Sequence, residues 1–310
     1  MTSINTNVSA MTALQSLSMI NSNLDQTQNR ISTGYRVGAA SDNAAYWSIA
    51  TTMRSDNKAL GAVEDALGLG QAKVDVAYTG LNAAIDVVDE IKSKLVAAKE
   101  PGVDRDKIQS EIGELQKQLG SIAKSASFSG ENWLSVNSDT GVNPSYQATK
   151  SVVSSFNRDS AGDVSVSTID INTASTALFD ENGAASGILD GTFVTTGATP
   201  LTVSVFNLDV SVATVDDQDL SDMIDGVENA LGLMTTAASN LGAAKNRMDI
   251  QSEFVSNLRD SIEKGVGTLV DADMTEESTR LKALQTQQQL GVQALSIANS
   301  SSQSILSLFR

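Results

Sequence analysis

Residues that could carry catalysis are few in this chain, because its 310 residues include neither cysteine nor histidine. Without cysteine there is no thiolate nucleophile, no disulfide and no thiolate metal ligand, and without histidine the commonest general base and metal ligand are missing. A serine–lysine scheme would need a motif that the sequence lacks. We therefore expect no enzyme, no metal site and no cofactor.

Two stretches resemble binding motifs only superficially. The acidic residues near position 273 do not alternate with a glycine turn as a calcium loop requires, whereas carboxylates at the start of a helix are favoured by its dipole. The stretch LGLGQ (67–71) lies inside a helical pattern and lacks the strand, loop and helix of a phosphate site. We interpret the acidic group as an ordinary helix start; it comprises Asp271, Asp273, Glu276 and Glu277.

Composition and charge narrow the class of partner. The chain carries 21 Lys+Arg and 37 Asp+Glu, a net charge of -16, so its surface repels phosphate backbones and anionic lipid, and we expect neither nucleic acid nor membrane as a partner. No apolar run approaches the ~20 residues of a membrane span, and the N-terminus lacks the basic and apolar regions of an ordinary signal peptide. Aromatic residues make up only 4%, which favours thin helical layers over a thick core.

Helical periodicity dominates the sequence. Apolar residues recur at steps of three, four or seven, which predicts helices over about 3–33, 43–99, 104–126, 219–269 and 276–310. Pro101-Gly102 ends the second helix, and a turn this short predicts that the second and third helices lie antiparallel.

Between about 128 and 216 the composition shifts to Ser, Thr, Gly and Val. Alternation over 163–167, 201–205 and 207–212 predicts strands, and Asn182-Gly183 and Asp190-Gly191 predict turns. The elements are ordered symmetrically about this region. We therefore expect a mainly α fold: a long antiparallel, coiled-coil-like helical rod with paired N- and C-terminal helices, and a small β-rich outer module at the far end of the rod.

The terminal helices carry apolar residues on more than one face, which is typical of helices surrounded by others. The expected surroundings are the same ends of other copies, so the ends would fold on assembly. The candidate polymerisation interface comprises Ile4, Val8, Met11, Leu14, Leu17, Leu24, Ile31, Leu281, Leu284, Leu290, Leu295, Ile297, Ile305, Leu308 and Phe309.

Two short segments separate the terminal helices from the rod: ISTGYRVGAASDNAAYWSIA (31–50), the first joint, and LVDADMTEE (269–277), the second joint. In the first, glycines let the chain turn, and Ser41 or Asp42 is expected to cap the next helix. Tyr46 and Trp47 are interpreted either as a local core plug or as side chains that set the angle between the two parts. The candidate joint residues are Gly34, Arg36, Gly38, Ser41, Asp42, Asn43, Asp271 and Asp273.

These segments together resemble the bacterial flagellins. The first joint looks like the family's signature between its innermost and next domains, and INTNVSAMTALQSL, FSGENWL, LVDADMTEES and SQSILSLFR occur in the family's order. The resemblance covers about 1–138 and 218–310, whereas 139–217, where flagellins vary most, matches no motif. Tyr35, Tyr46 and Trp47 give the chain the character of the α-proteobacterial branch.

The resemblance implies an inner terminal-helix domain (1–42 and 275–310), a helical rod domain (43–138 and 218–274) and a variable β-rich outer domain (139–217). It implies a structural subunit that polymerises into the flagellar filament for swimming motility. Such a chain is exported unfolded through the flagellar type III apparatus without a cleaved signal peptide and resides outside the cell. The implied partners are other copies of the chain, sister flagellins, an export chaperone, and the cap and hook–filament junction proteins.

One stretch departs from the family. Many flagellins carry an Arg-x-Arg-Glu-Leu core on the rod helix that animal innate immunity recognises, and the matching place here reads DEIKSKL (89–95). Glu90 stands where the first Arg would be, followed by Ile91 and Lys92, which predicts poor recognition by an acidic receptor surface. Two alternative functions stay open: a hook–filament junction protein of the same assembly, and a soluble coiled-coil scaffold or receptor-like signalling hairpin.

Overall fold

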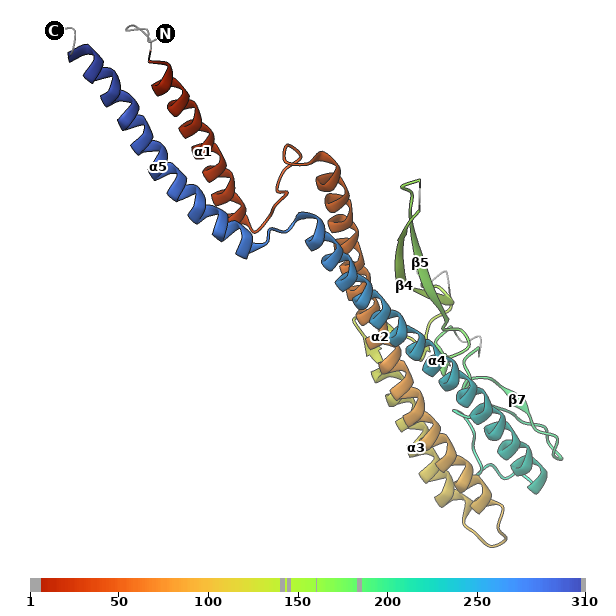
Figure 1. Ribbon diagram of the computed structural model, residues 1–310. Helices are drawn as coiled ribbons and strands as arrows, with labels where there is room; N and C mark the ends of the chain where they lie inside the picture. Colours follow the sequence, from red (N-terminus) through yellow and green to blue (C-terminus); the bar gives the residue numbers. More distant parts are fainter. Residues whose placement is uncertain (1–6, 140–142, 144–145, 160, 183–185, 308–310) are drawn as a thin grey trace. The chain divides into compact units, whose positions relative to one another are not determined.

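The computed structural model describes residues 7–139, 143, 146–159, 161–182 and 186–307, and the side chains of 301–307 lie outside that description. Five helices run through these residues (Figure 1): α1 (Val8–Thr33), α2 (Ala44–Ala98), α3 (Arg105–Ser125), α4 (Asp217–Val270) and α5 (Met274–Ser307). The five helices expected from periodicity are confirmed, with ends that differ by a few residues.

The chain is divided into two compact units. One unit is Ala59–Leu258, and the other joins Met1–Lys58 to Arg259–Arg310. Helices α2 and α4 contribute to both units, whereas α1 and α5 belong to the second unit only.

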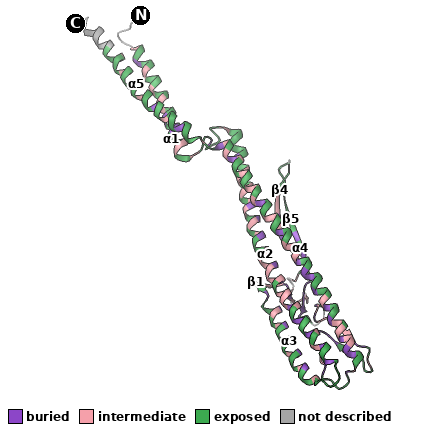
Figure 2. Ribbon diagram, turned by 60° about the horizontal axis from the view of Figure 1, so that its bottom comes forward, coloured by how far each residue is buried: buried purple, intermediate pink, exposed green. Residues whose placement is uncertain are grey.

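Within Ala59–Leu258, α2 packs antiparallel to both α3 and α4. Salt bridges mark the pairing, with Lys245 Nζ 2.6 Å from Asp75 Oδ1 and Lys94 Nζ 2.6 Å from Glu111 Oε2. The facing stripes bury their apolar side chains (Figure 2), among them Leu67, Leu81, Ile91, Leu95, Ile112, Leu119, Leu220 and Met223. The turn at Pro101-Gly102 reverses the chain as expected, with φ of 92° at Gly102.

The region between α3 and α4 contains short strands and one long hairpin. Three strand pairs are antiparallel: β1 (Ser127–Phe128) with β2 (Glu131–Asn132), β4 (Thr149–Arg158) with β5 (Val164–Asn172), and β7 (Phe193–Val194) with β8 (Thr202–Val203). One pair is parallel, namely β3 (Ser135–Val136) with β6 (Phe179–Asp180). The strand expected at 163–167 is confirmed by β5, the one at 201–205 is reduced to two residues, and 207–212 forms no strand. Sequence periodicity missed β4. Of the two expected turns, Asp190-Gly191 lies in a turn and Gly183 lies outside the described residues.

The sequence predicted that the β-rich region lies beyond the far end of the helices, and this prediction is wrong. It lies along their side: Val152 of β4 packs where a side chain on Gly70 of α2 would stand, and Phe193 of β7 packs against Gly226 of α4 (Figure 1). The reason is that α3 carries the chain back from the turn at residue 101, so the region begins beside the middle of α2. There Leu134 approaches Gly80.

In the other unit, α1 and α5 run side by side and antiparallel (Figure 1). A small core beside them joins the first joint to the start of α2 and the end of α4, and it consists of Val37, Ala50, Val266 and Val270 with Met53, Ile262 and Leu269 packed against it. Helix α1 begins at an Asn7 cap, whose Oδ1 accepts the Ala10 N–H at 3.0 Å, and ends at Gly34, where φ is 75°.

Candidate assembly surface and joint

Helices α1 and α5 meet along a seam with a seven-residue repeat. The inward positions of α1 are 10, 13, 17, 20, 24, 27 and 31, and those of α5 are 277, 281, 284, 288, 291, 295 and 298. Steps of three and four alternate without a break on both helices, which is the spacing of a two-helix coiled coil. Half of these side chains are Leu or Ile and the other half are small or polar, so the apolar part of the seam is narrow.

Several contacts fix how the two helices approach. Gln288 Nε2 donates to Asn21 Oδ1 at 2.8 Å, and Asn7 Nδ2 donates to the Ala298 carbonyl at 3.1 Å. A Cβ on Gly291 would stand 3.0 Å from Leu17 Cδ1, so glycine lets α1 come close. Next to this point an open groove of about 530 Å³ runs between the helices, lined by Val8, Ser9, Thr12, Ala13, Ser16, Gly291, Ala294 and Ala298.

The outward faces of the same helices carry large apolar side chains, which we call the outer set. Their exposed fractions run from 53% to 69%. The outer set consists of Val8, Met11, Leu14, Met19, Leu290, Val292 and Ile297.

The predicted interface residues therefore divide between two environments. Val8, Met11, Leu14, Leu290 and Ile297 are exposed, whereas Leu24 and Leu284 are buried in the seam and Leu17, Ile31, Leu281 and Leu295 are half-buried. Ile4, Leu308, Phe309 and the side chain of Ile305 lie outside the described residues.

The two joints are bonded to each other through their backbones. Tyr35 and Asp271 form a β-bridge, Arg36 N–H donates to the Val270 carbonyl at 2.7 Å, and Ala272 N–H donates to the Gly34 carbonyl at 2.9 Å. The Arg36 guanidinium also donates to the Leu269 carbonyl at 3.0 Å. Of the glycines expected to let the chain turn, only Gly34 has a positive φ; Gly38 does not.

The expected cap of α2 is wrong. Asn43 Oδ1 accepts the N–H groups of Ala45 and Tyr46, each at 3.1 Å, and so Asn43 is the cap. Asp42 Oδ2 instead accepts the N–H groups of Gly38 and Ala39, each at 3.0 Å, which closes the loop before the helix. Ser41 lies exposed in that loop.

Asp273 caps α5 in the corresponding position of the second joint. Its Oδ1 accepts the N–H of Thr275 at 2.8 Å and that of Glu276 at 3.2 Å. These backbone hydrogen bonds from Glu276 and Thr275 lower the pKa of the Asp273 carboxyl below its ordinary value. The interpretation of this acidic group as a helix start agrees with the hydrogen bonds that Asp273 makes.

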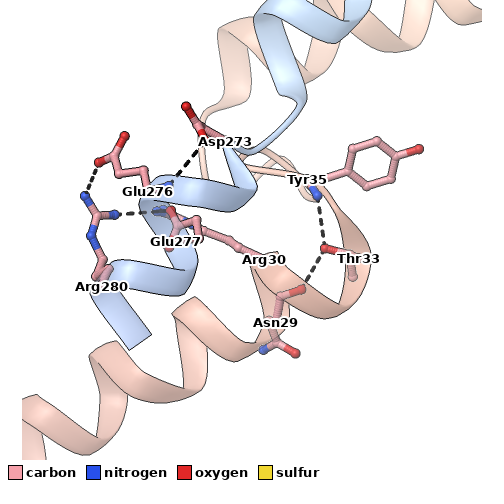
Figure 3. Close-up of polar contacts among 8 residues, drawn as sticks. All are labelled: Asn29, Arg30, Thr33, Tyr35, Asp273, Glu276, Glu277 and Arg280. Atoms are coloured by element: carbon pink, nitrogen blue, oxygen red, sulfur yellow. Dashed lines mark hydrogen bonds and ion pairs between the residues drawn. The ribbon is translucent and has the colours of Figure 1, made fainter. Parts of the chain in front are cut away.

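A charged cluster lies where α1 ends and α5 begins (Figure 3). Glu277 is only 5% exposed, and its Oε1 lies 3.2 Å from Arg30 Nη1 and 3.2 Å from Arg280 Nη1. Arg280 Nη2 also reaches Glu276 Oε1 at 2.7 Å. Sequence reasoning noticed the two glutamates but missed Arg30. Arg30 could have been found from the scarcity of charge in α1, in which Asp25 and Arg30 are the only charged residues.

Tyr46 and Trp47 do not form the core plug that was one interpretation of them. They are 42% and 38% exposed. Tyr35 is also partly exposed, and the Arg54 guanidinium lies over its ring, 4.7 Å from the centroid. The local core is made instead by the aliphatic residues around Val37.

In the stretch that differs from the family pattern, Ile91 is buried in the rod and Glu90 is exposed. Lys92 forms a salt bridge with Glu228 of α4, and the hydrogen bond that the Lys92 ammonium donates to Glu228 raises the pKa of that ammonium. Lys94, the other cation of this stretch, is paired with Glu111 of α3, so both cations already have a partner.

The described residues offer little that could support chemistry. No group of three or more acidic side chains among them is placed to hold a metal ion. None of the helices, over its described length, is long and apolar enough to cross a membrane. What the described part of the chain does offer is a helix pair with an apolar outer surface and a rod with a packed core, which is the make-up of a structural subunit.

Comparison with known proteins identifies the kind of subunit. The model of the bacterial flagellin N-terminal helical region matches residues 4–139, and that of the bacterial flagellin C-terminal helical region matches 224–309. The chain is 53% identical to flagellin C and 47% identical to flagellin A of Rhizobium meliloti (strain 1021), and 49% identical to a flagellin of Brucella melitensis biotype 1, with 100% of both chains covered each time. The chain therefore belongs to the bacterial flagellin family, in its α-proteobacterial branch. It is a structural subunit of the flagellar filament and not an enzyme.

Proposed function

We propose that the outer set of α1 and α5 forms the contact through which copies of this chain assemble. The observation that supports it is the exposure of seven large apolar side chains on one helix pair that is otherwise poor in charge. Exposed apolar surface of this extent marks an interaction site. Because the family polymerises into filaments, the partner that fits is a second copy of the chain.

The magnitudes favour assembly by several weak contacts. Burying a large apolar side chain completely contributes about 1.5–3 kcal/mol, so seven that are half to two-thirds exposed contribute roughly 5–14 kcal/mol. Association costs an estimated ~4–15 kcal/mol in lost freedom of motion. For a single contact, the free energy gained by burial therefore roughly equals the cost of association. A subunit that contacts several neighbours at once is stable. Growth should accordingly need a seed.

In this proposal the domains follow the plan that the resemblance implies. Residues 1–42 and 275–310 form the inner part of the filament, 43–138 and 218–274 form the rod around it, and 139–217 form the outermost part. The family resemblance also supports export without a cleaved signal, an extracellular location, and handling by an export chaperone and by the cap and junction proteins. Sister flagellins are further candidate partners.

Electron microscopy of the purified full chain, incubated with short filament seeds, tests this assignment. We expect long filaments from the full chain, none from a chain that lacks 281–310, and much slower growth from Leu290→Gln/Ile297→Gln. The matched control is Val164→Gln/Val166→Gln, which removes two comparably exposed apolar side chains from β5. Normal growth of the α5 variant would refute the proposed contact, and a full chain that stays monomeric would favour the junction or scaffold alternatives.

We further propose that innate immune receptors recognise this flagellin poorly. Glu90 reverses a charge that the family stretch needs, and the Lys92 ammonium is paired with Glu228. Purified monomer should activate the receptor weakly in a reporter-cell assay, and Glu90→Arg should raise its potency. Strong activation by the unmodified monomer would contradict this prediction.

A further inference from the structure

We propose that the Arg30–Glu277 ion pair selects the register in which α1 packs against α5. This inference concerns packing inside one chain, so it stands apart from the proposed contact between copies. It begins with the seam, whose repeat does not define a single alignment. A heptad pattern that slides by seven residues meets the same pattern again, and half of the seam side chains are small or polar.

The residues of the seam show this degeneracy directly. Positions 10, 17, 24 and 31 of α1 are Ala, Leu, Leu and Ile, and positions 284, 291 and 298 of α5 are Leu, Gly and Ala. A slide of one heptad sets Leu24, in place of Leu17, against Gly291 and again sets a branched aliphatic residue, Ile31, against Leu284. Apolar burial alone therefore distinguishes the two alignments only weakly.

Charge strongly distinguishes the observed alignment of α1 and α5 from the one shifted by a heptad. Arg30 is one of two ionised side chains in α1, and it meets Glu277 at the first seam position of α5 (Figure 3). Glu277 is 5% exposed, and its second oxygen, Oε2, has no hydrogen-bond partner among the described residues. Its Oε1 depends on Arg30 from the other helix and on Arg280 from its own. A slide of seven residues moves Arg30 about 10 Å along the axis and leaves the buried carboxylate with Arg280 alone.

The position of the pair at the helix ends strengthens the preference. Arg30 lies in the last turn of α1 and Glu277 in the first turn of α5, where each charge is favoured by the dipole of its own helix. Buried ionic groups contribute little net stability compared with apolar ones, but removing one partner is costly, which is how such a pair penalises the wrong alignment. The backbone bonds between the joints are the competing explanation for a fixed register, because they tie Gly34 to Ala272.

Thiol cross-linking separates these explanations, and the chain has no cysteine of its own to interfere. Cysteines at Asn21 and Gln288 report the observed alignment, since these two side chains are hydrogen-bonded. Cysteines at Gln28 and Gln288 report a slide of one heptad, because residue 28 lies one repeat further along the same face of α1. Each reporter is placed in the full chain and treated with a short thiol cross-linker, both as soluble subunit and in seeded filaments, and the intrachain product is identified by peptide mass spectrometry.

With the native pair intact, we expect the 21–288 product to dominate. Arg30→Gln should raise the ratio of 28–288 to 21–288 product by about tenfold or more, which corresponds to ~1.4 kcal/mol. Arg280→Gln is the matched control: it removes the other partner of Glu277 but, being on the same helix, cannot change the register. Arg30→Gln/Glu277→Gln should keep the pairing and also show the slipped product, because no buried charge then opposes it.

Three results would overturn the inference. If Arg30→Gln lowers both products together, the pair only stabilises the helix contact. If Arg30→Gln leaves the ratio unchanged, the joint backbone holds the register without the pair. Absence of the 21–288 product from the native sequence in both states would refute the α1–α5 pairing itself, and with it the register role.

Discussion

Protonation of Asp180 should weaken the unit formed by Ala59–Leu258 below about pH 4. This carboxylate is 5% exposed and accepts hydrogen bonds from Ser138 N–H at 2.9 Å, Ser138 Oγ at 2.5 Å and Asn182 N–H at 3.1 Å, and a further one from Ser186 Oγ. Burial raises its pKa, but the hydrogen bonds from Ser138, Ser186 and Asn182 outweigh that effect and lower the pKa from 3.8 to about 2.

The size of the effect follows from this pKa difference. At about 1.4 kcal/mol per unit, the ionised form stabilises the folded state by about 2 kcal/mol at pH 7. Because the folded pKa is the lower one, the stabilisation is complete above the unfolded pKa near 4 and is lost as pH falls towards 2. By pH 3 about 1 kcal/mol of it has gone. The pKa of neighbouring Asp190 is raised, chiefly by burial, so its contribution has the opposite sign and must be removed by comparing variants.

Urea unfolding of the full chain measures this prediction. Trp133 is buried in the unit and Trp47 is not part of it, so Trp47→Phe leaves a fluorescence signal from Trp133 alone. We expect Asp180→Asn to cost about 2 kcal/mol at pH 7, which is a midpoint about 1 M lower in urea, and about half as much at pH 3.

Asp209→Asn serves as the matched control. It neutralises a carboxylate of the same region that, among the residues the structure describes, accepts hydrogen bonds from the nearby Ser211 alone, so the midpoint should change little. A pH-independent difference between Asp180→Asn and the native sequence would show that ionisation of Asp180 is not the cause. Equal stability at pH 7 would refute the reasoning altogether.

Two further predictions concern backbone positions. Gly70→Ala would place a Cβ 2.4 Å from Val152 Cγ1 and should destabilise the unit by about 1–3 kcal/mol in the same urea assay, whereas Gly68→Ala, with open space around it in the same helix, should stabilise it by about 0.5–1 kcal/mol. Equal effects of the two would contradict the close approach of β4 to α2. Asn43→Ala should cost about 1 kcal/mol and lower the temperature at which filaments dissociate by a few degrees, and Ser41→Ala should not; the reverse order would restore Ser41 as the cap of α2.

The helices could be predicted because their signal is local. An apolar stripe with a 3.6-residue period persists over tens of residues, and Pro101, Gly102 and the capping Asp104 mark the ends of two of them. The sequence does not show in the same way which of Ser41, Asp42 and Asn43 caps α2. All three residue types cap helices, and only the loop geometry, in which Asp42 bonds back to Gly38, leaves Asn43 for that role.

The strands were less predictable because alternation reports burial and not the hydrogen-bonding partner. Leu208 and Val210 alternate and are buried, but the backbone there bonds to side chains of α3: Val210 N–H donates to Gln109 Oε1 at 2.9 Å, and Gln116 Nε2 donates to the Leu208 carbonyl at 3.0 Å. No strand forms as a result. In β4 the opposite happens, because an irregularity between Val153 and Ser155 breaks the alternation of a genuine strand.

The candidate interface was predictable in outline, since apolar residues on several faces can be counted from the sequence. Which of them face the partner helix and which face outwards depends on how α1 and α5 approach each other. Gly291 and the Arg30–Glu277 pair lie where the two helices meet, and the paired charges are 247 positions apart in the chain. No local pattern connects two residues at such a separation.

The division between seam and outer set leads to one last prediction. If the seam acts inside the chain and the outer set acts between chains, Arg30→Gln and Leu290→Gln impair different contacts. Residues 277 and 290 lie about 20 Å apart along α5, beyond the range at which substitutions usually couple. Their effects on the filament dissociation temperature should then add. If filaments of the double variant dissociate at the same temperature as those of the more impaired single variant, register and assembly depend on one shared contact. The outer set could then not be treated as a separate surface.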